Sequence, residues 1–88
     1  MTLTNQILEI LSKEENVSVE LYNSTTKLYS SMQFDLRFKK EIVTTYDFAA
    51  ITANKYKNIN ELESHLNETF SLTDWSSYEI SSVDKITY

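Results

Sequence analysis

The sequence predicts an α+β fold in which two helices cover one face of an antiparallel sheet of three to four strands. Three observations favour this two-layer sandwich. Apolar residues recur at helical spacing in two segments, and they alternate with polar residues in the segments between them. The chain has 88 residues, of which 41% are hydrophobic and 24% charged, and this suits a single domain over residues 1–88.

The first predicted helix spans Leu3–Lys13. Its apolar residues follow the i, i+4, i+7, i+8 spacing of one helix face, at Leu3, Ile7, Ile10 and Leu11. Thr2 is a suitable N-cap because its hydroxyl can accept a bond from a free N–H of the first turn. Asn16 is expected to take the left-handed position after the helix, which glycine usually fills.

Three antiparallel strands are predicted next, at Val17–Leu21, Met32–Phe38 and Ile42–Phe48, because apolar residues alternate with polar ones in each. A polar turn at Asn23–Thr26 joins the first two strands, and Lys39–Glu41 is a plausible hairpin connection for the next two. The interval from Ala49 to Tyr56 stays open between strand and helix, since Phe48, Ile51 and Tyr56 also fit a helical spacing.

The second helix is predicted over Ile59–Phe70, where an apolar stripe follows a capping box formed by Asn58 and Glu61. After it, two short alternating runs between Tyr78 and Tyr88 suit a further strand, with a bulge at Ser81–Ser82. The expected order is therefore helix, three strands, helix, strand.

Glycine, proline and cysteine are all absent, and their absence excludes several classes of chemistry. Phosphate-cradling loops depend on glycine, while disulfides, thiolate nucleophiles and most zinc cages need cysteine. No cofactor is expected. No apolar run approaches the length of a membrane span and no basic, then hydrophobic, leader is seen, so a cytoplasmic location is expected.

Catalytic groups are sparse. His65, the one histidine, follows Glu61 by one helical turn and precedes Glu68 by three residues, but a third or fourth metal ligand is missing. This pattern is more typical of a solvated helix edge, so we expect neither a metal site nor an enzyme.

The net charge of −5 is divided unevenly: residues 1–26 carry −3, residues 27–57 carry +3 and residues 58–88 carry −5. In the basic middle third, Arg37, Lys39 and Lys40 lie near a hairpin, and Lys55 and Lys57 flank Tyr56. Direct nucleic-acid binding is disfavoured because the acidic flanks repel phosphates.

The acidic final third suggests a binding surface for a basic partner. Its carboxylates are Glu61, Glu63, Glu68, Asp74, Glu79 and Asp84. Together on one face, they would resemble a row of phosphates.

In length, charge and the order of elements from Leu3 to Phe70, the chain resembles small acidic phage-encoded inhibitors of the anti-CRISPR type. The resemblance implies a phage or mobile-element protein that acts in the cytoplasm of a bacterial host cell, where it blocks a host CRISPR nuclease by occupying its basic DNA-binding groove. No inhibitory residue can be matched one to one, and the basic residues of the middle third depart from a uniformly acidic surface.

A structural or adaptor protein is the alternative. It would self-associate, as a homodimer, through an edge strand or through the sheet face that the helices leave open. Contacts on that face are expected from Tyr29, Gln33, Asp35 and Arg37.

Overall fold

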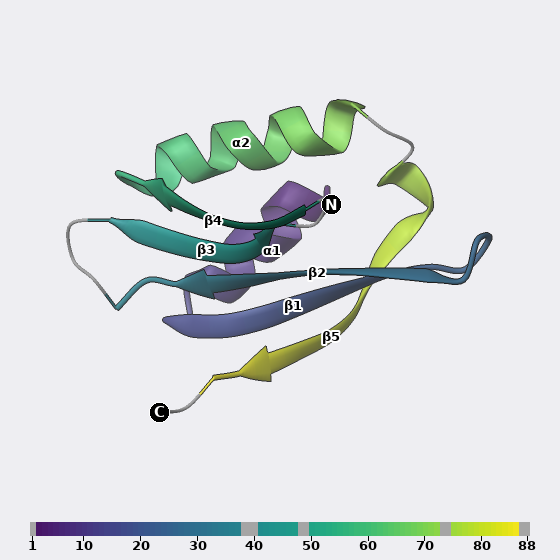
Figure 1. The fold of residues 1–88 in the computed structure, drawn as a ribbon, viewed down its shortest axis with the longest axis horizontal. Coiled ribbons are helices and arrows are strands. Elements are labelled where there is room, and N and C mark those ends of the chain that lie inside the picture. Colours follow the sequence, from purple (N-terminus) through teal and green to yellow (C-terminus); the bar gives the residue numbers. More distant parts are fainter. Residues whose placement is uncertain (1, 38–40, 48–49, 73–74, 87–88) are drawn as a thin grey trace.

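A computed structural model describes residues 2–37, 41–47, 50–72 and 75–86 (Figure 1). The elements follow in the order α1 (Leu3–Leu11), β1 (Asn16–Asn23), β2 (Leu28–Asp35), β3 (Ile42–Asp47), β4 (Ala50–Tyr56), α2 (Ile59–Leu72), the 3-10 helix η1 (Trp75–Ser77) and β5 (Tyr78–Lys85). Two helices with an antiparallel sheet confirm the predicted α+β class.

The sheet has five strands in the spatial order β4-β3-β2-β1-β5, and every neighbouring pair is antiparallel. The interval that the sequence left open forms β4, where Tyr56 pairs with Ile42 and Lys55 pairs with Val43 of β3. The prediction of three to four strands was therefore one strand short. The chain then crosses through α2 to the far edge of the sheet, where β5 pairs with β1.

One face of the sheet is covered by both helices. Figure 1 shows α1 behind the strands and α2 running beside β4. The two helices and the covered face share one apolar core, formed by Ile7, Leu11, Val17, Val19, Leu21, Met32, Phe34, Ile42, Leu62, Leu66 and Trp75. Alternation in the strands and the i, i+4 spacing of the helices direct these side chains inward.

Helix α1 begins as the sequence predicts and ends earlier. The Thr2 hydroxyl oxygen accepts a 3.1 Å hydrogen bond from the Asn5 N–H. The helix ends at Leu11, with Ser12 as its C-cap. The left-handed turn expected at Asn16 is wrong, because Asn16 pairs with Asp35 as the first residue of β1.

The turn between β1 and β2 is held by one side chain. The Asn23 side-chain oxygen accepts hydrogen bonds from the N–H groups of Thr25 at 2.9 Å and Thr26 at 3.2 Å. Lys27 follows with a φ of 62°, the left-handed region in which glycine carries no steric penalty. An Asx turn and a left-handed lysine thus close this hairpin without glycine.

Helix α2 starts with a modified capping box. The Asn58 side-chain oxygen accepts a 3.0 Å bond from the Glu61 N–H, as predicted. The Glu61 carboxylate, however, accepts its 2.8 Å bond from the N–H of Lys57, one residue before the cap. The helix then continues to Leu72, two residues beyond the predicted end.

Among the described residues, no helix is both long and apolar enough to cross a membrane. The predicted hairpin residues Lys39 and Lys40, together with Phe48 and Ala49, lie outside the described ranges.

Candidate functional site

The open face of the sheet, opposite the helices, displays the side chains that alternate with the core residues. Leu21, Met32 and Phe34 are fully buried, so their neighbours Tyr22 and Gln33 point to the other face. The strand pairings extend this face across β2, β1 and β5. On these three strands it includes Tyr29, Ser31, Gln33, Asp35, Asn16, Ser18, Glu20, Tyr22, Glu79, Ser82 and Asp84.

Three of the four residues expected on this face lie there. Tyr29, Gln33 and Asp35 pair with Tyr22, Ser18 and Asn16 of β1. Arg37 follows the end of β2, and its guanidinium binds the Asp35 carboxylate through two bonds, Nε–Oδ1 at 2.9 Å and Nη2–Oδ2 at 2.7 Å. The Arg37 hydrogen bond holds the pKa of Asp35 below its usual value, because a positive donor favours the ionised carboxylate.

Five of the six predicted acidic residues lie in the described part of the chain, and the structure divides these five between separate surfaces. Glu79 pairs with Tyr22 and Asp84 pairs with Ser18, so both carboxylates lie on the open face, at its β5 edge. Glu20, which the prediction omitted, lies between them on β1, opposite Ser82. We call Glu20, Glu79 and Asp84 the sheet acids.

A β-bulge in β5 places two of the sheet acids on the same side. Residues five positions apart would point to opposite faces of a regular strand. Between Glu20 and Leu21 the register shifts, with Ser82 opposite Glu20 and Ile80 opposite Leu21, so Ser81 is an extra residue. The Ser81 hydroxyl donates to the Glu20 backbone oxygen at 3.2 Å and lies 3.1 Å from its carboxylate. This confirms the bulge predicted at Ser81–Ser82.

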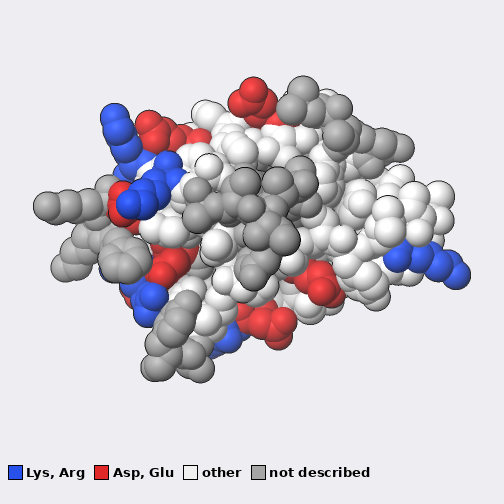
Figure 2. Space-filling model, in the orientation of Figure 1, with Lys and Arg blue, Asp and Glu red and all other residues white. Residues whose placement is uncertain are grey.

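The helix acids, Glu61, Glu63 and Glu68, occupy α2 on the covered side of the sheet. At 100° per residue, Glu61 and Glu68 share one flank of the helix, and Glu63 lies on the other flank beyond the buried Leu62 and Leu66. Figure 2 shows red and blue side chains intermingled where α2 begins, rather than one continuous red patch. Asp74 lies outside the described residues.

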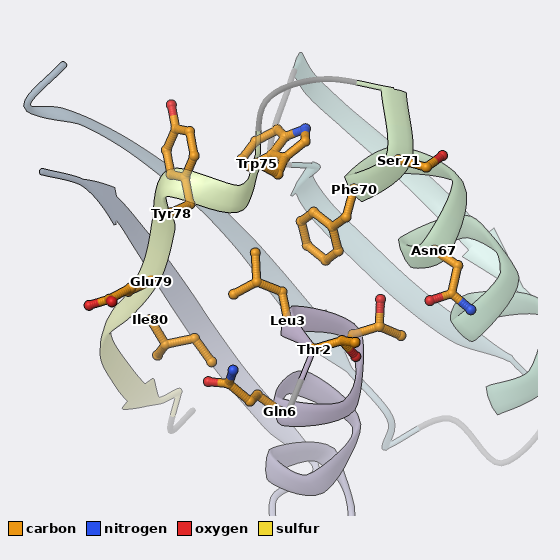
Figure 3. A pocket seen from close by; sticks show the side chains of 11 residues that line it. Thr2, Leu3, Gln6, Asn67, Phe70, Ser71, Trp75, Tyr78, Glu79 and Ile80 are labelled. Carbon is orange, nitrogen blue, oxygen red and sulfur yellow. The ribbon is translucent and has the colours of Figure 1, made fainter. Parts of the chain in front are cut away.

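A cleft of about 720 Å³ opens between the start of α1, the end of α2, η1 and β5 (Figure 3). Its apolar wall contains Leu3, Phe70, Trp75, Tyr78 and Ile80, and the uncharged polar residues of the lining are Thr2, Thr4, Gln6, Asn67 and Ser71. Trp75 contacts Phe70 and Tyr78, with ring centroids 5.5 and 4.6 Å apart. Glu79 borders the cleft, but Figure 3 shows its carboxylate directed away from the aromatic rings.

The residues considered for metal or acid–base chemistry do not form a cluster. His65 is half-buried against Tyr56, with ring centroids 5.2 Å apart. In the described ranges, no group of three or more His, Asp or Glu side chains could hold a metal ion. Two of the basic residues considered for nucleic-acid binding form ion pairs: Arg37 with Asp35, and Lys55 with Glu41 at 3.6 Å.

The described residues define the class of the protein: a two-layer α+β domain in which the helices cover one face of a five-stranded antiparallel sheet. The comparisons add no family to this class: no family model matches the chain, and neither curated proteins nor solved structures give a significant match.

Glu20 could have been found from the sequence. It stands between Val19 and Leu21, whose alternation already marked the apolar face of that strand. The same alternation predicts Tyr29, Gln33 and Asp35 on the open face. What the sequence does not indicate locally is that β5 pairs with β1, and only this pairing brings Glu79 and Asp84 beside Glu20.

Proposed function

We propose that this chain is a non-enzymatic interaction protein of phage or mobile-element origin that inhibits a host nucleic-acid enzyme of the CRISPR nuclease type. It does so by placing the sheet acids in the basic groove that otherwise holds nucleic acid. The observation that carries the proposal is the position of three carboxylates, Glu20, Glu79 and Asp84, on one uncovered sheet face.

The spacing of these carboxylates suits a groove that binds a phosphate backbone. Glu79 and Asp84 pair with β1 residues four positions apart, which corresponds to about 13 Å along the strand. Glu20 lies between them on the neighbouring strand. Three negative charges therefore follow one another in the strand direction, alternating between two neighbouring strands, as phosphates follow one another along a strand of nucleic acid.

The sheet acids are also free of internal ion pairs in the described part of the chain. The ion pairs formed there join Lys13 to Glu9, Arg37 to Asp35, Lys55 to Glu41 and Lys85 to Glu14. A basic partner would therefore meet carboxylates whose charge is not already neutralised. On α2, by contrast, the Glu61 carboxylate already accepts a hydrogen bond from the Lys57 N–H at the start of the helix.

Two charge-reversed variants test the proposal with a matched control. The first carries Glu20→Lys, Glu79→Lys and Asp84→Lys, and the second carries Glu61→Lys, Glu63→Lys and Glu68→Lys. Both change the net charge by the same amount, but on different surfaces. DNA cleavage by a panel of purified CRISPR nucleases is measured with increasing amounts of each protein.

For a nuclease that the unaltered chain inhibits, we expect the first variant to need at least about tenfold more protein, because like charges then face each other. The second variant should inhibit nearly as well as the unaltered chain. Inhibition should also weaken as salt rises. An equal loss of inhibition in the two variants contradicts the proposal. So does a result in which the unaltered chain inhibits no nuclease of the panel.

Self-association is the second candidate, and the position of β5 at the edge of the sheet supports it. Light scattering on the same samples decides between the two: a dimer that persists at high salt, with no nuclease inhibited, favours assembly. The Ser81 bulge argues against simple edge pairing, because bulges interrupt the regular row of donors and acceptors.

A further inference from the structure

Two tyrosines stand next to the sheet acids on the open face. Tyr29, Tyr22 and Glu79 form one row across β2, β1 and β5, since Tyr22 pairs with Tyr29 on one side and with Glu79 on the other. Glu20 lies two residues before Tyr22 on the same face of β1. Side chains directly opposite in a sheet have Cβ atoms about 5 Å apart, so rings and carboxylates are neighbours here.

The β1–β2 hairpin extends beyond β3 and β4 (Figure 1), and on it the Tyr29 side chain is exposed and the Tyr22 side chain is half-buried. In the described part of the chain, the pairing between β2 and β3 covers Gln33–Asp35 and does not reach Tyr29. The ring of Tyr29 contacts Tyr22, with centroids 4.6 Å apart and planes inclined at 40°. Even so, Tyr29 keeps 64% of its surface exposed.

An exposed tyrosine that contacts a half-buried one, beside carboxylates, is suited to bind one type of side chain above others. The guanidinium of arginine is planar, stacks on aromatic rings and donates paired hydrogen bonds to a carboxylate. Lysine offers the same charge but no plane and no fork of donors. Tyrosine and arginine are also among the residues that dominate binding energy in protein interfaces.

We propose that Tyr22 and Tyr29, with Glu20 and Glu79, bind an arginine side chain of a basic protein segment. The guanidinium lies against the tyrosine rings and donates to the carboxylates. This inference deepens the proposed function, on which it rests, by naming the partner chemistry: the groove that the chain enters presents arginine at this position.

The test uses two labelled peptides, octa-arginine and octa-lysine, which carry equal charge. Fluorescence anisotropy at low and moderate salt gives the dissociation constant of each. We expect the unaltered chain to bind octa-arginine roughly three- to tenfold more tightly than octa-lysine, which corresponds to one cation–π contact.

The double variant Tyr22→Leu, Tyr29→Leu should bind the two peptides with nearly equal affinity, because octa-arginine loses its ring contact. Its affinity for octa-lysine should be nearly unchanged. The single variant Tyr29→Leu, at an exposed site, covers the case in which the double variant fails to fold. Glu20→Gln with Glu79→Gln should weaken both peptides, and the matched control, Glu61→Gln with Glu68→Gln, should weaken them less.

Equal affinity of the unaltered chain for the two peptides overturns the inference, and so does an arginine preference that survives in the tyrosine variants. These outcomes are separate from those of the nuclease assay. If the charge reversal on the open face abolishes inhibition while no arginine preference exists, the proposed function stands and this inference fails. If the preference depends on the tyrosines but no nuclease is inhibited, the proposed function fails.

Discussion

The two faces of the sheet are built from alternate residues of the same strands, and they differ in what they contribute. On the covered face Val19, Met32 and Phe34 are fully buried between strands and helices. On the open face their neighbours Glu20 and Gln33 carry polar groups into solvent. Stability therefore depends on one face, and the other is free to carry charges and rings that serve binding.

The largest expected effect is a difference in stability between substitutions at two neighbouring residues of β2. Phe34→Ala should lower the free energy of unfolding by about 3–5 kcal/mol, because it leaves a cavity in the core. Gln33→Ala, one residue away on the open face, should change it by no more than about 0.5 kcal/mol. Urea denaturation of both variants measures the difference. Similar losses in the two would contradict the division between the faces.

A smaller change in stability, of opposite sign, is expected from a substitution in β3. Thr44 is fully buried on the covered face, and its hydroxyl has no hydrogen-bond partner in the described part of the chain. Thr44→Val removes this unsatisfied group and should stabilise the fold by about 1 kcal/mol. Thermal unfolding should then shift upward by about 4–8 °C.

Thr45→Val is the matched control for that substitution, since Thr45 pairs with Gln33 on the open face. We expect it to leave the unfolding temperature nearly unchanged. A Thr44→Val variant that melts below the unaltered chain would show that the buried hydroxyl does have a partner.

The smallest expected effect concerns charge on the open face. The pKa of Asp35 is lowered in the folded chain by the Arg37 hydrogen bond, so this pair stabilises the fold above the unfolded pKa of about 3.9. That contribution is lost as the pH falls through the lower, folded pKa. Arg37→Ala should raise the pKa of Asp35, as followed by NMR titration of its carboxyl carbon.

Arg37→Lys should give an intermediate pKa for Asp35, because lysine keeps the charge and loses the paired hydrogen bonds. An unchanged pKa in both variants would show that the Arg37 contact does not persist in solution. The exposed position of Arg37 limits the effect on stability.

Patterns within short stretches of the sequence predicted the features that depend on neighbouring residues. Alternation placed Met32 and Phe34 in the core, and the spacing of Leu62 and Leu66 set the buried side of α2. The side chains of Thr2 and Asn58 cap the two helices as expected. These features depend on residues within one turn or one strand, so a single sequence contains the information.

The fourth strand and the arrangement of the acids were not predictable in the same way. Residues 50–56 form an edge strand whose one partner is β3, so a strict alternation of apolar residues is not required there. The separation of the helix acids from the sheet acids follows from the order β4-β3-β2-β1-β5. That order is set by contacts between distant segments, which no local pattern records.

The pairing of β1 with β5 has a consequence for how the binding surface is assembled. The hairpins from β1 to β4 join strands that are adjacent in sequence, whereas Glu20 and Ser82 meet across about 60 residues. Contacts between such distant segments form slowly, because a long loop must close first. Without this pairing, the β1–β2 hairpin would carry the tyrosine pair and Glu20 but not the two β5 carboxylates. The complete site therefore requires the pairing of longest sequence separation in the described sheet.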